Sequence, residues 1–177
     1  MTTFEYLAVL ISIIVGLGIT HLLGGIARFV HHPARYRLHW IHYVWIWYVF
    51  VFLLYFWWFQ LWMNTVEDWS SALYVHLVLY SVLLYLLCVV ITPPDSLEDG
   101  GFREYFFARR GWFFGVLLAI GAVDFVDCLI KDHGFAHWFL FMPLFVGAIL
   151  TKNAKYHGFL ALLFAVGITL GLFLPAY

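Results

Sequence analysis

Long apolar runs, separated by short polar stretches, make up nearly the whole chain. The runs do not alternate apolar with polar residues as half-exposed β-strands do, and several reach the roughly 20 residues that a helix needs to cross a bilayer. Because backbone inside hydrocarbon must satisfy its own hydrogen bonds, such runs are expected to be helices rather than barrel strands. The pattern predicts an all-α membrane protein, a six-transmembrane-helix bundle formed by residues 1–177 as one domain, with spans at roughly 4–30, 38–63, 70–92, 107–130, 136–151 and 156–175.

The fifth of these spans has the weakest pattern. From His137 to Thr151 a helix reaches only about 22 Å at 1.5 Å per residue, and Pro143 is expected to kink or interrupt it. A re-entrant segment is the alternative interpretation, and it would move Lys152 and Lys155 to the other face of the membrane.

Composition agrees with a membrane protein, since 65% of the residues are hydrophobic and only 11% are charged. The N-terminus carries Glu5 and lacks the basic region and small-residue site of a cleavable signal peptide. The chain has no basic tail or patch of the kind that is typical of nucleic-acid-binding proteins, so no nucleic-acid partner is expected.

The basic residues predict the orientation. All except Lys131 lie in or beside the first, third or fifth connector, namely Arg28, Arg35, Arg37, Arg103, Arg109, Arg110, Lys152 and Lys155. The positive-inside rule makes that face cytoplasmic and gives an N-out/C-out topology. Cys88 and Cys128 then lie most of a membrane apart, so they are expected to be packing residues rather than a disulfide.

The segment 40–63 is the most aromatic part of the chain and holds most of its nine tryptophans. Helical spacing puts His42, Val49, Phe56 and Gln60 on one face, which is expected to point inward. The rings at mid-depth have three interpretations: packing into small-residue grooves of spans one, four and six, a site for a flat hydrophobic ligand, or a surface for another subunit. The candidates for the ligand site are Trp45, Trp47, Phe52 and Tyr55.

Ionisable groups within the spans are functional candidates, because each costs at least ~2.5 kcal/mol to insert. Asp124 and Asp127 share a helix face, and two close carboxylates are typical of proton exchange or cation binding. The alternative is structural: Asp127 pairs with Lys131, and Asp124 hydrogen-bonds a neighbouring helix. Glu5, His76 and Gln60 are expected at a similar depth, where they could line an outward-facing polar vestibule with the aspartates.

His21 is the deepest histidine from the cytoplasmic side. Small and polar residues on two faces of span one predict a central position for this helix in the bundle. His21 could relay protons, bind haem, or hydrogen-bond a backbone carbonyl. A haem would need a second histidine at matching depth, and His42 and His157 both lie about one turn nearer the surface. No Cys/His spacing typical of zinc is apparent, so no metal is expected.

The third connector is the only extended polar segment. Pro93 and Pro94 are expected to end span three, and Asp95 or Ser96 to cap a short interfacial helix that Gly100 and Gly101 then break. The arginines nearest the cytoplasmic headgroups are expected to contact anionic lipid: Arg28, Arg35, Arg37, Arg109 and Arg110.

The stretches EYLAVLISIIVGLGITHLL and FREYFFARRGWFF resemble a group of small, uncharacterised multi-pass bacterial inner-membrane proteins. The resemblance implies the bacterial cytoplasmic membrane and no particular activity. No nucleophile–base pattern is apparent, which disfavours catalysis. The first interpretation of function is a scaffold or partner subunit of a membrane assembly, as a homo-oligomer or within a larger complex. The alternatives are a proton- or ion-conducting or sensing module, and a haem- or quinone-binding electron carrier.

Overall fold

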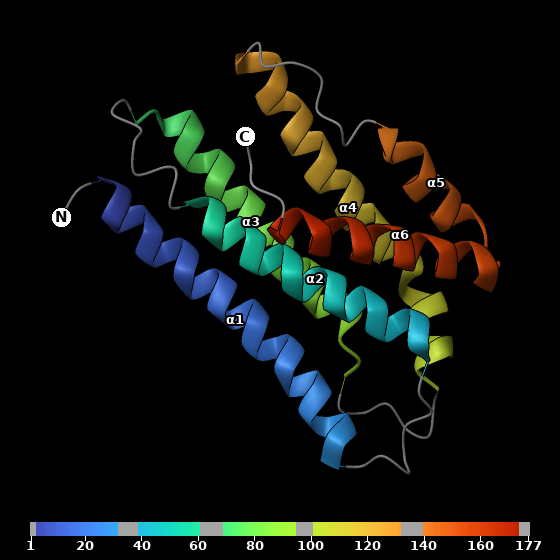
Figure 1. Cartoon of the computed structure of the whole chain (residues 1–177). Coiled ribbons are helices and arrows are strands. Elements are labelled where there is room, and N and C mark those ends of the chain that lie inside the picture. The colour runs from blue at the N-terminus through green and yellow to red at the C-terminus, as the bar shows by residue number, and fades with distance from the viewer. Residues whose placement is uncertain (1–2, 32–38, 61–68, 95–100, 132–139, 174–177) are drawn as a thin grey trace.

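A computed structural model (Figure 1) describes residues 3–31, 39–60, 69–94, 101–131 and 140–173. The protein is all-helical over these residues. Its helices are α1 (Thr3–His31), α2 (Trp40–Phe59), α3 (Ser71–Ile91), α4 (Phe102–Lys131), α5 (Met142–Leu150) and α6 (Ala154–Phe173). Five of them, all except α5, are long and apolar enough to cross a membrane.

Two helix starts follow from local capping. Ser70 precedes α3, and its hydroxyl accepts a hydrogen bond from the Leu73 backbone N–H at 3.1 Å. Asn153 precedes α6, and its side-chain oxygen accepts from the Lys155 N–H at 3.0 Å. Both side chains satisfy a backbone donor that the first helical turn leaves without an intrahelical partner.

The third connector differs from the prediction. The segment FREYF belongs to α4, which begins at Phe102, five residues before the predicted start of span four at 107. Tyr105 N–H bonds the Gly101 carbonyl, so the helix continues back to the glycine. The proposed short helix capped by Asp95 or Ser96 lies outside the described residues.

The fifth span also differs in detail. α5 has nine residues and is about 14 Å long at 1.5 Å per residue, too short to cross a bilayer by itself. Pro143 does not interrupt this helix but lies in its first turn, where the missing N–H costs no intrahelical bond. Residues 136–139 of the predicted span lie outside the described part of the chain.

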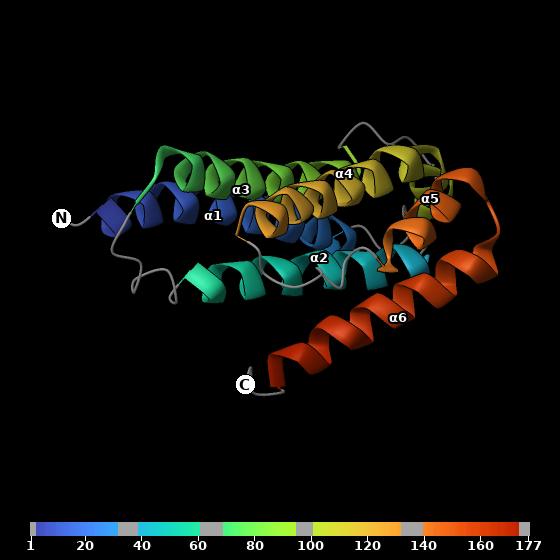
Figure 2. The same ribbon diagram turned by 90° about the horizontal axis from the view of Figure 1, so that it is seen from above.

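Consecutive helices run in opposite directions, so the start of α1 and the end of α6 lie at the same end of the bundle (Figures 1 and 2). The other end carries most of the described basic side chains and is called the basic end here. These residues are Arg28, Arg103, Arg109, Arg110, Lys152 and Lys155.

Helix α2 is the centre of the bundle. Seen from above, α1, α3 and α4 lie on one side of it and α6 on the other (Figure 2), and α6 packs extensively against α2. Of the membrane-spanning stretch of α2, 56% is buried, against 28% for α1. The prediction that α1 is central is therefore wrong: α1 packs along α3 at the edge of the bundle.

The rings of α2 pack largely against other rings, although the Trp40 ring does lie against Gly158 of α6, where an added methyl group would be 2.8 Å from it. Trp45 meets Phe113 and Phe114 of α4 and Phe164 of α6, with ring centroids 5.1, 5.3 and 6.0 Å away. Gly18 of α1 does lie against α2 and α3, because a methyl group there would be 3.2 Å from Cys88 Sγ and 3.7 Å from Leu53. At other predicted groove residues an added methyl meets no described atom within 4 Å: Gly16, Gly24, Gly111, Gly115, Gly167 and Gly171.

Candidate functional site

Helix α2 and its C-terminal cap carry four polar side chains that are almost completely buried. His42 and Trp45 are 0% exposed, Tyr48 is 1% exposed and Gln60 is 6% exposed. Both nitrogens of His42, the Trp45 indole N–H, the Tyr48 hydroxyl and the Gln60 amide nitrogen have no hydrogen-bond partner among the described residues. We call these four residues the buried polar row. The predicted inward face of His42, Val49, Phe56 and Gln60 is confirmed, since all four are buried.

At the basic end, three histidines surround one phenylalanine of α4. The Phe106 ring centroid lies 6.5 Å from that of His39, 6.1 Å from that of His42 and 5.6 Å from that of His157. His39 directly precedes α2, and His157 lies in the first turns of α6. The fold therefore brings the histidines of α2 and α6, and the one that directly precedes α2, around the same ring.

The imidazole of His157 is oriented by a backbone carbonyl. Its Nε2 lies 3.0 Å from the Thr151 carbonyl oxygen. Because a carbonyl only accepts, Nε2 carries the proton and Nδ1 is left as an acceptor in the neutral ring. Nδ1 is buried with no hydrogen-bond partner in the described part of the chain.

His39 lies outside the membrane-spanning stretches, and its surroundings disfavour its charged form. Burial lowers the pKa of His39, and the Arg103 guanidinium lowers it further, while Glu104 opposes both. His39 is therefore held in its neutral form down to a more acidic pH than a free imidazole.

Tyr105 of α4 connects this helix to the end of α3. Its hydroxyl lies 2.9 Å from the Val90 carbonyl oxygen and 3.0 Å from that of Thr92, so it donates to the carbonyl groups that end α3. The Tyr105 ring also lies edge-on to His42, at 6.1 Å between centroids. Phe102 stacks on the other side of His42 at 5.3 Å.

At the opposite end of the bundle, Tyr80 of α3 and Asp124 of α4 come together. The Tyr80 hydroxyl lies 3.4 Å from an Asp124 carboxylate oxygen, longer than a tight O–H···O hydrogen bond. Phe56 of α2 stacks flat on the Tyr80 ring at 5.0 Å, and the His76 ring lies 6.1 Å from it. Asp124 is also within electrostatic range of Tyr48.

The predicted vestibule is only partly assembled. His76 and Asp124 meet through Tyr80, and Gln60 is buried at the same end of α2. Glu5 is exposed in the first turn of α1. The Asp127 side chain, like its predicted partner Lys131, lies outside the described residues.

His21 does not join the histidines at the basic end. It lies on α1, the edge helix, and is only partly buried. The haem interpretation, which needs His21 to face His42 or His157, finds no support, because these two rings pack against Phe106 instead, with centroids 6.1 and 5.6 Å away. No three His, Cys, Asp or Glu side chains among the described residues are placed to hold a metal ion.

The four candidates for a hydrophobic ligand site do not line one surface. Trp45 and Phe52 are buried, whereas Trp47 is 50% exposed and Tyr55 is 39% exposed. The Trp47 indole donates to Thr169 of α6 at 3.2 Å. Two of the four candidates for the ligand site are therefore buried in the core, and the other two are partly exposed on the surface of α2.

The predicted headgroup arginines gather at the basic end as far as they are described. Arg28 lies in the last turn of α1, and its Nε donates to the Gly24 carbonyl at 3.3 Å. Arg109 is exposed and Arg110 is partly buried on α4. Arg35 and Arg37 lie outside the described residues.

Sequence reasoning missed five residues of this site, namely Tyr48, Tyr80, Phe102, Tyr105 and Phe106. A signal was available for Tyr48, which lies beside the inward-facing Val49 and at helical spacing from Trp45 and Phe52. None was available for Tyr80 and Phe106, whose roles depend on which helices are neighbours.

Taken together, the fold and composition define an all-helical protein with the character of an integral membrane protein. The comparisons identify nothing more specific, because no family model, no curated protein and no solved structure matches the chain.

Proposed function

We propose that the protein conducts or senses protons in the bacterial cytoplasmic membrane, along the inward face of α2. The observation that carries the proposal is the buried polar row, whose polar atoms lack partners in the described structure. A polar group left unsatisfied in hydrocarbon costs several kcal/mol. Four such residues on the central helix therefore favour a partner from outside the chain, and water in a proton path is the simplest one.

The residue types suit proton transfer. Tyr hydroxyls and imidazoles both donate and accept, whereas the Trp45 indole only donates and would orient water. Along α2, Tyr48 and His42 are about 9 Å apart, too far for a direct hydrogen bond, so transfer between them needs intervening water. Asp124 is the acceptor at one end, and His42, His157 and His39 form the other end.

The charge distribution supports an orientation for this path. Basic side chains gather at the end of the bundle where His39 and His157 lie, and the positive-inside rule favours that end in the cytoplasm. We accordingly propose that both termini face the outside, with the six crossings that the sequence predicts. Asp124 would then face the external side of the path.

The test is proton flux into proteoliposomes that enclose a pH-sensitive dye and are driven by a potassium diffusion potential. Tyr48→Phe removes only the buried hydroxyl and is expected to lower the wild-type flux at least tenfold. Asp124→Asn is expected to lower it similarly. The matched control is Tyr55→Phe, on the exposed side of the same helix, which should retain the flux.

A wild-type flux no greater than that of empty liposomes would contradict the proposal. The scaffold interpretation would then take its place. It expects another membrane protein to co-purify with the chain, and expects Asp124→Asn to leave that association unchanged.

A further inference from the structure

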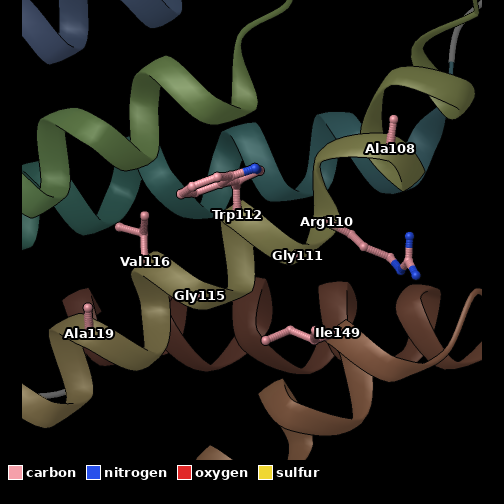
Figure 3. A pocket seen from close by; sticks show the side chains of 8 residues that line it. All are labelled: Ala108, Arg110, Gly111, Trp112, Gly115, Val116, Ala119 and Ile149. Carbon is pink, nitrogen blue, oxygen red and sulfur yellow. The ribbon is translucent and has the colours of Figure 1, made fainter.

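A groove runs along the outer face of α4 beside α5. Its volume is about 710 Å³, within the range of small-molecule sites. Figure 3 shows Trp112 and Val116 on one side of α4 and Arg110, with Ile149 of α5, on the other. Gly111 and Gly115 lie between these two rims.

The glycines keep the floor of the groove open. A methyl group added at Gly111 or Gly115 would meet no described atom within 4 Å. The groove extends from Ala108 to Ala119, about 16 Å along the helix axis. This length matches one leaflet of a bilayer whose hydrocarbon core is about 30 Å thick.

The charge of the groove is concentrated at one end. Among the described residues that line the groove, Arg110 alone is charged, and Arg109 is exposed beside it. One terminal nitrogen of Arg110 donates to the Phe107 carbonyl at 2.6 Å. Arg110 Nε is shielded from solvent and has no hydrogen-bond partner among the described residues. Because Nε is shielded, the terminal nitrogens of Arg110 and the exposed Arg109 side chain are the donors suited to a phosphate oxygen at this end of the groove.

We propose that the groove binds one phospholipid with an anionic headgroup. The phosphate lies at Arg110, and one acyl chain lies over Gly111 and Gly115 towards Ala119. Trp112, which is 68% exposed, forms a rim at the headgroup half of the groove.

A second copy of the chain fits this groove less well. In the same membrane orientation, it would bring its own Arg109 and Arg110 to the same depth. If the two copies packed groove to groove, like charges would then face each other at the basic end, where the groove needs an anion.

The test is a lipid titration of the detergent-purified protein by native mass spectrometry, with phosphatidylglycerol and phosphatidylcholine of identical acyl chains. The wild type is expected to bind one phosphatidylglycerol at least tenfold more tightly than phosphatidylcholine. Gly115→Leu fills the groove and should weaken phosphatidylglycerol binding at least tenfold. Gly167→Leu adds the same side chain at an equally open glycine of α6 and should leave binding within twofold.

Three further variants separate charge from shape and guard against misfolding. Arg110→Gln should remove the preference for phosphatidylglycerol, whereas Lys152→Gln, an exposed cation at the same end, should retain it. Gly111→Leu repeats the groove-filling change, and circular dichroism verifies that each variant keeps wild-type helicity. Equal binding of the two lipids by the wild type, or equal effects of Gly115→Leu and Gly167→Leu, would overturn the proposal. A change of oligomeric state in Gly115→Leu with an unchanged lipid titration would also overturn it, because the groove would then be an interface between copies.

Discussion

Helices α1 and α2 are both long and apolar, yet they occupy opposite environments. Both are apolar enough to cross a membrane, but 28% of the spanning stretch of α1 is buried, against 56% for α2. Each carries a histidine: His21 on α1 is partly exposed, and His42 on α2 is 0% exposed. Apolar character alone therefore does not decide which of the two helices lies at the centre.

This difference is expected in a membrane and would be surprising in water. Lipid tails are as apolar as a leucine side chain, so an apolar helix gains little by leaving lipid for the protein interior. Polar side chains do gain, because lipid offers them no hydrogen bonds. The polar atoms of His42, Trp45 and Tyr48 thus favour a central position for α2, and candidate chemistry is best sought on this helix.

The contrast between the central helix α2 and the edge helix α1 is tested most strongly by a substitution at Trp45. Its ring contacts α4 and α6 at once, so Trp45→Ala leaves a cavity in the centre of the bundle. We expect the free energy of unfolding to fall by about 3 kcal/mol, measured by reversible unfolding in mixed micelles.

Trp58→Ala is the control for that prediction, since Trp58 is on the same helix and 60% exposed. Its free energy of unfolding should change by no more than about 0.5 kcal/mol. Equal losses at the two positions would mean that α2 is not the central helix.

Periodicity alone was enough to find the inward face of α2. His42 and Gln60 are eighteen residues apart, which is a whole number of turns at 3.6 residues per turn, and both are buried. Five of the predicted spans, all except the fifth, overlap helices long enough to cross a membrane, because spans of this length leave the backbone few alternatives.

The contacts between helices could not be predicted in this way. Tyr80 reaches Asp124 across 44 residues of sequence, and Phe106 lies among histidines that precede α2 and begin α6. Periodicity shows which residues share a face, but not which helix that face meets. For the same reason, small residues on α1, α4 and α6 predicted grooves for the α2 rings, although several of these glycines face open space.

A smaller loss of stability is expected from a substitution on α1 at the point where this helix contacts the centre of the bundle. Gly18 is the closest approach of α1 to Cys88 and Leu53, both of which are 0% exposed. Gly18→Leu overpacks this contact and should lower the free energy of unfolding by about 2 kcal/mol. Thermal unfolding in detergent, monitored by circular dichroism, measures the change.

Gly16→Leu places the same side chain two residues away, on the same helix, where an added methyl meets no described atom within 4 Å. Its stability should stay close to that of the wild type. If Gly16→Leu were as destabilising as Gly18→Leu, α1 would be packed on more than one face and would not be an edge helix.

The smallest expected effect has the opposite sign. Tyr48→Phe deletes a hydroxyl that is buried without a partner among the described residues. It should therefore raise the free energy of unfolding by about 1 kcal/mol, whereas Tyr55→Phe on the exposed side should change it by less than about 0.5 kcal/mol. A gain in stability together with a loss of proton flux would show that the hydroxyl is kept for transport at a cost to the fold. A loss of 1 kcal/mol or more would instead show that the Tyr48 hydroxyl is satisfied within the protein, and the buried polar row would no longer support a proton path.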